Sequence, residues 1–537
     1  MTTRSYAGAV NSRLTSDWLT SYTSADAEIK TGRKSLIARS RDLDRNNEYA
    51  ARYFKLLLNN VLGACGIKLQ MKIQNPDGSY DTGANDAIEM AWEDQCKAKN
   101  FTVSGQHTKR QIERLVLHAA ARDSGALVRI VRGFDNARKY AVQLIEIDQL
   151  DHDFDGIFEG NEVRMGIEFD QWKRPIAYHI FNDHPGDTLH RAKRRRARIP
   201  ADELIHVYMP TRIGQNVGVP WIAPSILPLK MLAGYEEAEL VAAREAACKG
   251  AAIENTTPDQ FQGEVDGRGN ELQDMEPGMV LNLGPGQVYK AIDPTHPNQA
   301  FGDFVKSKLR GSASGMGVSY VSLANDLEGV NYSSIRSGEL EQREEWKAIQ
   351  EWFIETFEGR LFEDWLQWEL TMGLIKSTSG VALPASKFDK FNKPEWTPRR
   401  WPWVDPQADM EAHKTAIAMR IESRNQVIKE LGGDMEAIDK DFENDPVTKN
   451  LDTDSVYAPD SKPEPQPVAA ERVIQPISNH ISPAPVTINV PESKVRVEFP
   501  KDTPKPVKRI EFNRNSRGEI TGALVEETNG NNRSDLH

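Results

Sequence analysis

The sequence has little cysteine and no long apolar run. Its 537 residues include three cysteines, Cys65, Cys96 and Cys248, which lie far apart and form no CxxC pair. This spacing excludes a disulfide framework or a cysteine-rich zinc site and is typical of a reducing compartment. No stretch of about 18 apolar residues could cross a bilayer, and Met1 to Trp18 lack the apolar core of a signal peptide. We therefore expect a large, soluble, intracellular protein.

Positive charge is also in deficit. The chain has 67 Lys and Arg residues against 79 Asp and Glu residues, which gives a net charge of -12. A protein that wraps DNA tightly must neutralise phosphates with cations, so this balance disfavours that class of protein. The 39% of apolar residues can nevertheless form a sizeable core, and the length predicts three or four domains of about 150 residues each.

The common signatures of enzymes are missing as well. The sequence contains no GxxxxGK(S/T) phosphate loop, no HExxH zinc motif and no GxSxG nucleophile turn. The glycine-rich stretch from Gly311 to Gly317 has no lysine and follows no predicted strand, so it does not indicate a nucleotide site. We therefore predict that the protein is not an enzyme and has no cofactor.

Hydrophobic periodicity divides the first 220 residues into helices followed by strands. Residues 1 to about 35 have little periodic apolar content and are predicted to form a mobile arm with at most one short helix. Apolar residues at three- and four-residue steps predict one amphipathic helix from Leu43 to Val61, which ends near Gly63. This part is expected to be mixed α/β, with further helices at 87–99 and 108–121 and strands at 126–131, 140–147, 164–169 and 176–181.

The remaining part of the chain is predicted to be mainly helical. A stripe from Trp346 to Trp365 has the spacing of a core-facing helix surface, and proline becomes frequent after residue 450. We expect helices at 223–249, 301–315, 335–372 and 409–431, a strand-like piece at 279–283, a loop up to Ser334, a cap at Gly432 and Gly433, and a hairpin at 510–526.

Three alanines lie on one stripe of the predicted helix 223–249. They are Ala238, Ala242 and Ala246. Small side chains at this spacing allow another helix to approach closely, but alanine also simply favours helix. The residues alone leave both interpretations open.

One acidic segment matches the spacing of a calcium-binding loop. Asp151, Asp153, Asp155, Gly156 and Glu162 occupy positions 1, 3, 5, 6 and 12 of an EF-hand loop. The flanking residues alternate as strands, whereas an EF-hand requires helices on both sides. A calcium-binding module or enzyme that uses this loop is therefore an alternative, and an ordinary acidic turn between strands fits the context better.

A basic run offers a second alternative. The segment Arg191–Arg198 holds six basic residues and no acidic one, which is typical of a site for nucleic acid or for an acidic partner. A solvated loop before a strand explains the run equally well. No aromatic side chains alternate with the cations, so stacking of single-stranded bases is disfavoured.

Four collinear blocks resemble the lambda-type portal proteins of tailed bacteriophages. Together they extend over roughly residues 36 to 445, and the third block is the most specific. The chain departs from the family pattern at Val217 and at Arg399–Pro402, and the tail beyond 450 has no counterpart in it. The blocks are Arg39–Leu43 with Arg45–Asn47 and Tyr49–Arg52, then Ile199–His206 with Arg212–Gln215 and Gly218–Pro220, then Asp326–Arg336, and finally Trp403–Pro406.

The resemblance implies an α+β, multidomain portal fold that forms a ring, usually dodecameric, at one capsid vertex. Terminase would pump DNA through this ring, and the DNA would later leave through it into the tail. The implied domains are an N-terminal arm (1–35), an α/β wing (36–221), stem helices (222–250 and 301–317), a small α/β clip (251–300), a tunnel loop (318–334), a long helix with wing and crown helices (335–450) and a Pro-rich tail (451–537).

The resemblance also implies roles for particular residues. The tunnel loop would place Asn325, Asp326, Asn331, Tyr332, Ser333 and Ser334 near DNA. Lys306, Lys308 and Arg310 would face the channel, and the Ala238, Ala242, Ala246 stripe would contact a neighbouring subunit. No metal site is expected, and an acidic ring would let a polyanion slide without binding it.

The implied partners follow from the same family. They are copies of the chain itself, viral double-stranded DNA, the terminase large subunit, the major capsid and scaffold proteins and the head-completion or adaptor proteins, without a membrane. The protein would be located in the virion and assembled in the host cytoplasm.

Overall fold

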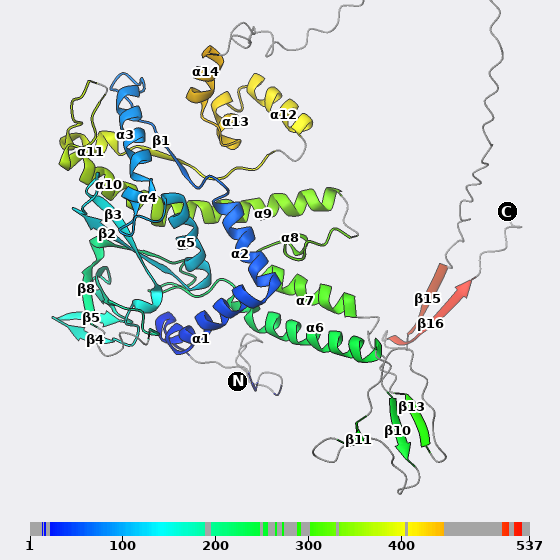
Figure 1. Ribbon diagram of the computed structural model, residues 1–537. Coiled ribbons are helices and arrows are strands. Elements are labelled where there is room, and N and C mark those ends of the chain that lie inside the picture. Colours follow the sequence, from blue (N-terminus) through cyan, green and yellow to red (C-terminus); the bar gives the residue numbers. More distant parts are fainter. Residues whose placement is uncertain are drawn as a thin grey trace, which may run out of the picture. The chain divides into compact units, whose positions relative to one another are not determined.

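The computed structural model divides the chain into two units, Met1–Pro459 and Asp460–His537. Among the described residues, the first unit contains the elements from α1 to α14 and the second contains two strands (Figure 1). The structure describes residues 22–187, 195–247, 301–328, 332–377, 379–402 and 406–444, together with Arg13, Ser16, Asp17 and strands at 251–255, 264–265, 271–272, 287–291, 507–514 and 520–528.

Two helices begin the first unit. α1 spans Ala25–Asn46 and α2 spans Glu48–Val61. The backbone of Asn47 is extended, and its side chain accepts a hydrogen bond from the Ala50 amide at 3.0 Å, so this residue ends α1 and caps α2. The short helix predicted within the N-terminal arm is therefore a 22-residue helix that begins at Ala25 and extends beyond the arm, and the single helix predicted from Leu43 to Val61 is divided at Asn47.

Three further helices lead to the first sheet. They are α3 (Thr82–Gln95), the single turn α4 (Ala98–Phe101) and α5 (Lys109–Arg122). Thr108 and Gln111 form a reciprocal capping box, in which each side chain accepts from the backbone amide of the other. α5 confirms the helix predicted at 108–121. The helix predicted at 87–99 corresponds to α3, which begins earlier and ends at Gln95, and to the separate turn α4.

Two antiparallel sheets follow. The first has the strand order β3–β2–β9 and the second has the order β4–β5–β6–β7–β8. The four predicted strands correspond to β2, β3, β6 and β7, whereas β4, β5, β8 and β9 were missed because runs of five residues or fewer show little alternation. The bounds are β2 (Ala126–Arg132), β3 (Tyr140–Ile145), β4 (Gly156–Phe158), β5 (Asn161–Arg164), β6 (Ile167–Phe169), β7 (Pro175–Phe181), β8 (Arg196–Pro200) and β9 (Leu204–Val207).

A helical pair follows the sheets. α6 spans Ile226–Ala247, and the chain returns beside it in α7, Phe301–Gly315 (Figure 1). Both agree with the predicted helices 223–249 and 301–315. The connection contains the antiparallel pairs β10 (Ala251–Asn255) with β13 (Gln287–Ala291) and β11 (Glu264–Val265) with β12 (Glu271–Leu272), while the predicted strand 279–283 lies outside the described residues.

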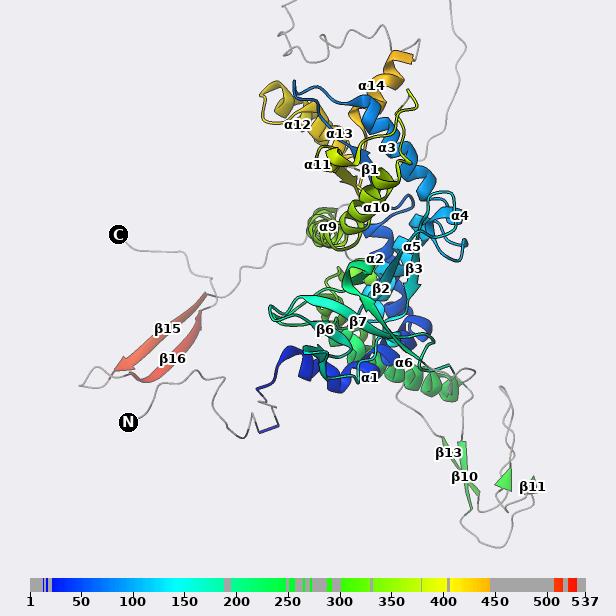
Figure 2. The ribbon, with the colours of Figure 1, turned by 90° about the vertical axis from the view of Figure 1, so that its left-hand side faces the viewer.

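The loop predicted at 318–334 contains helix. α8 spans Tyr320–Ala324 and α9 begins at Tyr332, so that prediction is corrected. α9 (Tyr332–Phe353) continues through the π-helical turn η7 (Ile354–Glu358) into α10 (Gly359–Met372). The long helix predicted at 335–372 is thus present, and one π turn interrupts its α-helical hydrogen bonds. Figures 1 and 2 show α9 running past α2.

Short elements complete the two units. β14 (Pro394–Thr397) follows α11 (Phe388–Phe391) and pairs with the distant β1 (Lys68–Met71). The single helix predicted at 409–431 is instead α12 (Pro406–Ala418) and α13 (Arg424–Glu430), because Arg420 adopts a left-handed backbone between them. α14 (Met435–Asn444) ends the helices, and the second unit contains the antiparallel pair β15 (Val507–Arg514) and β16 (Ile520–Thr528), where the hairpin was predicted.

The long helix supplies the centre of the main core. Phe357, Leu361 and Trp365 are fully buried, and the ring of Trp365 meets the ring of Trp92 from α3 with centroids 4.7 Å apart. Residues of α2 and α5 belong to the same cluster. The aromatic stripe is therefore a core surface, as predicted. No helix in the described part of the chain is long and apolar enough to cross a membrane.

Candidate functional site

Helix α6 has apolar side chains on two faces. Leu229 and Leu232 are buried inside the unit. On the other face Leu227, Met231 and Val241 are 66%, 67% and 45% exposed, although side chains of this kind usually avoid water. Of the predicted alanine stripe, Ala238 is exposed and Ala242 is half-buried, while the side chain of Ala246 lies outside the described residues. The helix therefore presents an apolar surface that nothing in the described chain covers.

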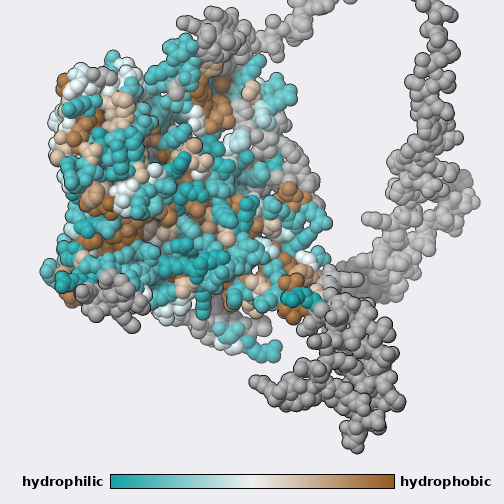
Figure 3. Space-filling model, viewed as in Figure 1, coloured by the Kyte–Doolittle hydropathy of each residue, from teal (hydrophilic) through white to brown (hydrophobic). Residues whose placement is uncertain are grey.

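This surface continues onto α7 as a groove. The groove has a volume of about 560 Å³, and Figure 3 shows apolar residues gathered where α6 and α7 lie side by side. Lys308 lies at its edge, with Nζ 5.4 Å from the centre of the Phe304 ring. Lys308 therefore belongs to this side of the α6–α7 pair. The lining residues are Leu227, Pro228, Met231, Leu232, Tyr235, Phe304 and Lys308.

The opposite side of α7 meets the segment after α8. Lys306 Nζ donates a hydrogen bond to Glu328 Oε2 at 2.9 Å and lies 3.6 Å from Asp326 Oδ2. The bond to Glu328 and the charge of Asp326 raise the pKa of Lys306 above its ordinary value. The structure thus brings a predicted stem cation and a predicted loop residue together in one ion-pair cluster.

Tyr320 connects the second stem cation to the same cluster. Its hydroxyl donates to Asp326 Oδ2 at 2.7 Å, and this bond lowers the pKa of Asp326. The Arg310 guanidinium lies 5.3 Å from the centre of the Tyr320 ring, a cation–π distance. Sequence reasoning missed Tyr320 and Glu328, because their importance lies in contacts across the turn.

The other predicted loop residues are only partly described. Asn325 adopts a left-handed backbone with φ 54° and ends α8. Asn331 lies outside the described residues, and Tyr332, Ser333 and Ser334 form the first turn of α9, although their side chains also lie outside the description.

The acidic segment 151–162 does not have the architecture of an EF-hand. Its flanking elements are strands, and β4 and β5 lie inside the segment itself. Each carboxylate pairs with a different cation: Asp151 with Arg196 at 3.0 Å, Asp153 with Lys34 at 2.7 Å, Asp155 with Lys30, and Glu162 with Arg164 and Lys173. The carboxylates therefore point to separate partners, and the calcium alternative loses its support.

The basic run is also partly neutralised by acidic partners. Arg198 donates to Glu168 at 2.8 Å, and Arg196 pairs with Asp151 while its guanidinium lies 3.8 Å from the centre of the Phe154 ring. Arg191, Lys193 and Arg194 lie outside the described residues. Two of the six cations thus have structural roles, which weakens the nucleic-acid alternative.

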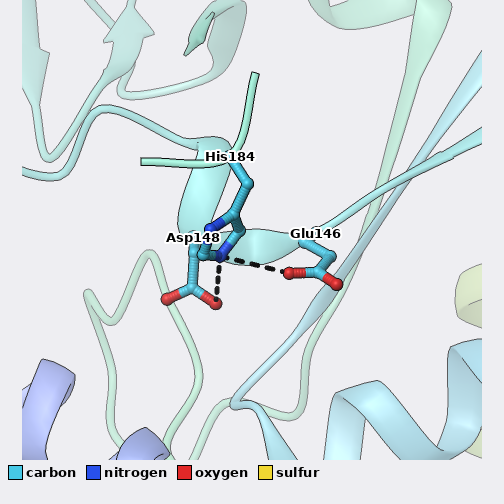
Figure 4. Close-up of side chains that lie close together, drawn as sticks. All are labelled: Glu146, Asp148 and His184. Atoms are coloured by element: carbon cyan, nitrogen blue, oxygen red, sulfur yellow. Dashed lines mark ion pairs between the residues drawn. The ribbon is translucent and has the colours of Figure 1, made fainter. Parts of the chain in front are cut away.

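Glu146, Asp148 and His184 form a three-residue cluster that the sequence did not reveal (Figure 4). His184 Nε2 lies 3.2 Å from Glu146 Oε2 and 3.7 Å from Asp148 Oδ2. Its Nδ1 accepts a hydrogen bond from the Gly186 amide at 3.0 Å, so the proton of the neutral ring belongs on Nε2. Nε2 lies within ion-pair distance of both carboxylates but makes no hydrogen bond to either, and Asp148 accepts a hydrogen bond from Arg41 at 2.5 Å. Two of its polar atoms, His184 Nδ1 and Asp148 Oδ2, thus already have hydrogen-bond partners within the protein.

Residues 11–350 match the family model described as phage portal protein, lambda family. This match covers more than half of the chain. The chain belongs to the lambda family of phage portal proteins. It is 34% identical over 442 residues to the "Probable portal protein" of Halomonas phage phiHAP-1, covering 80% of this chain and 84% of that one. It is 23% identical over 351 residues to the "Portal protein" of Escherichia phage N15, covering 58% and 65%.

Solved structures of gene transfer agent particles show a weaker likeness. A chain from the neck of an empty particle matches with a TM-score of 0.42 and 12% identity, covering 75% of this chain and 94% of that one. A chain from the virion of the native particle matches with a TM-score of 0.39 and 13% identity, covering 75% and 99%. The family membership rests on the sequence matches. Proteins of this portal family are structural, non-enzymatic components of the phage.

The structure explains why two portal-family blocks have their residues. In the first block, Asn47 caps α2 and Arg41 pairs with Asp123 at 2.8 Å. In the second block, a Cβ at Gly218 would lie 2.0 Å from the Ser124 carbonyl oxygen, so only glycine fits there. Residues of both blocks therefore stabilise the fold of the portal protein. The third block begins at Asp326, in the ion-pair cluster, and ends within α9.

Proposed function

We propose that the chain assembles with copies of itself into a closed ring, dodecameric as is usual in its family, at one vertex of the capsid. DNA enters the head through this ring during packaging and leaves through it during ejection. The observation that carries the proposal is the uncovered apolar surface of α6 in a member of the portal family. A helix that is apolar on both sides is normally covered on both sides, and a second copy of the same chain provides that cover.

The exposed residues of α6 have the spacing of a helix–helix seam. Leu227, Met231, Gly234, Ala238 and Val241 follow one another at steps of four, three, four and three residues, and all five are exposed. Seams with this spacing pack against another helix at a small crossing angle. Gly234 and Ala238 have small side chains and permit a close approach at the middle of the seam. In a ring the contact is heterologous, so the seam of one subunit meets a different surface of the next.

The remaining assignments follow the family architecture. We assign 36–221 to the wing, α6 and α7 to the stem, 251–300 to the clip and 335–450 to the long helix with the wing and crown. The clip is the surface proposed for the terminase large subunit and later for the head-completion proteins. Capsid and scaffold proteins would meet the wing, with assembly in the host cytoplasm. The stem side with Lys306 and Arg310 is proposed to face DNA.

The ring can be tested by disrupting the seam. Met231→Asp places a charge in the proposed subunit contact, where burial of an unpaired charge is costly, and it should shift the purified protein from closed rings to monomers. Native mass spectrometry and negative-stain images measure this shift. Ile157→Asp is the matched control, because Ile157 is 80% exposed on β4 of the wing and lies outside the seam.

The control variant should form rings as the wild type does. A wild-type chain that stays monomeric in the presence of capsid and scaffold proteins would contradict the proposed function. Rings that form equally well with Met231→Asp would contradict only the assignment of the seam.

A further inference from the structure

Lys306, a cation of the proposed DNA-facing side, already pairs with carboxylates of the same chain. Lys306 has two carboxylates within 3.6 Å, those of Asp326 and Glu328. A lysine held in this way presents no net positive charge to a polyanion, because the two acids more than balance it. In the described conformation, Lys306 therefore cannot act as a simple phosphate contact.

The two ends of the segment 319–328 are held very differently. Near its start, Leu323 is buried, Ser322 Oγ donates to Gln342 at 3.0 Å, and the Ser322 carbonyl accepts from Arg52 at 3.2 Å. Near its end, Leu327 is 66% exposed and the Glu328 side chain is 81% exposed. The first end is thus fixed to the body of the unit, whereas the second is held to α7 mainly by charge.

The bonds to Lys306 are weak enough to exchange. Exposed ion pairs contribute about 0–1 kcal/mol each, and salt screens them. A DNA duplex carries one negative charge per about 1.7 Å of its axis, so a duplex beside α7 offers many competing oxygens. Phosphate and carboxylate bind a lysine ammonium in the same way, and either can replace the other without a large cost.

We propose that Asp326 and Glu328 mask Lys306 as internal substitutes for phosphate, and that a passing duplex displaces them. Tyr320 positions Asp326 for this role through its hydroxyl. The turn at 326–328 opens when a phosphate takes Lys306 and closes when the phosphate moves on. Each contact between Lys306 and DNA is then brief, because the two carboxylates bind Lys306 again when the phosphate leaves. A channel through which DNA moves in both directions requires such brief contacts. This inference rests on the proposed function.

Duplex binding by purified rings tests the masking. Asp326→Asn with Glu328→Gln frees Lys306 and should raise duplex affinity about threefold or more at low salt. The plot of log affinity against log salt should become steeper by about one for each subunit in contact. Adding Lys306→Gln should return both quantities to the wild-type values. The matched control is Asp135→Asn with Glu162→Gln, which removes two carboxylates that pair with Lys139 and Lys173 of the wing.

Amide hydrogen exchange tests the turn without DNA. Lys306→Gln should speed exchange at 326–328 and leave 320–324 unchanged. Unchanged exchange in this variant, or a control that raises affinity as much as the double variant, overturns the masking. If wild-type rings bind duplex but the double variant binds no better, the masking alone is wrong. If neither ring binds duplex even at low salt, the masking is wrong, whereas the proposed ring and channel need no tight binding and are tested separately by Met231→Asp.

Discussion

Replacing Lys109 with Met should lower the free energy of unfolding by about 3–5 kcal/mol, because it breaks a buried ion-pair cluster. The side chains of Lys109, Glu113 and Glu358 are 6%, 1% and 0% exposed. Lys109 Nζ donates to Glu113, and it lies 2.8 Å from Glu358 Oε2 on the π turn. Without the ammonium group, two carboxyls would remain in the core with no cation. Urea denaturation at neutral pH measures the loss.

A surface variant provides the control for this experiment. Lys139 pairs with Asp135 at 2.9 Å, but that pair is exposed, so Lys139→Met should change stability by less than about 1 kcal/mol. An equal effect of the two variants would show that burial of the cluster contributes nothing.

Glu358→Gln removes the ionisable group of Glu358 and keeps the size of the side chain, so it tests how the charge of Glu358 affects stability. Burial raises the pKa of Glu358 well above its ordinary value, so the folded chain keeps this proton to a higher pH than the unfolded chain does. The unfolded chain loses that proton above about pH 4.5, so this group costs stability as pH rises from there towards the folded pKa. Gln resembles the protonated acid. The variant should therefore lose this slope of stability against pH, while its stability near pH 5 stays almost unchanged. A slope that persists in the variant would assign it to another group.

Acidification from pH 7 to pH 5 should destabilise the chain through two buried histidines. Burial lowers the pKa of His206 to about 3 and that of His152 to about 2, and the charge of Arg33 adds to both shifts. Both rings are therefore neutral in the folded chain. His206 makes no hydrogen bond through either ring nitrogen, and Arg33 contacts His152 and donates to Ser124 at 2.9 Å.

The sign of the effect follows from proton uptake by the unfolded chain. An unfolded histidine has a pKa of about 6.5, so this contribution to stability is fully present above that pH. It is lost as pH falls, at about 1.4 kcal/mol per pH unit for each histidine. His206→Leu should remove about half of the slope and leave stability at pH 7.5 equal or higher, since the ring nitrogens have no partners. Denaturation midpoints between pH 5 and 7.5 measure the slope, and an unchanged slope in the variant would contradict the assignment.

Hydrophobic periodicity predicted the helices and strands that bury an apolar face. It did not predict those that bury polar or charged side chains. The stripe from Trp346 to Trp365 and strand β2 were predicted because their apolar residues repeat with the period of the element. The start of α1 was missed because its buried residues include Asp26 and Arg33. Asp26 accepts two hydrogen bonds from Asn216, and Arg33 donates to Ser124. Hydrogen bonds between residues far apart in sequence leave no periodic signal.

The sequence predicted only part of the candidate site, because spacing shows which residues share a helix face but not which faces are covered. Spacing placed Lys306 and Arg310 on one face of a helix and pointed to the alanines of α6, since helix geometry fixes both. Spacing did not show that Lys308 lies on the other side of α7 from Lys306 and Arg310. It also could not show that the seam of α6 extends through Leu227, Met231 and Val241, because exposure depends on which faces the rest of the chain covers.

By itself, the sequence determined the family, the mixed helix and sheet content, the long aromatic helix and the helical pair α6 and α7. These follow from local motifs and from the periods of helix and strand. Only the tertiary structure decided that the acidic segment 151–162 is an ion-paired turn and that Asp326 and Glu328 hold Lys306. A sequence records which residues are charged, but the partner of each charge is set by the packing of distant segments, and a charge with a partner has a different chemistry from a free one.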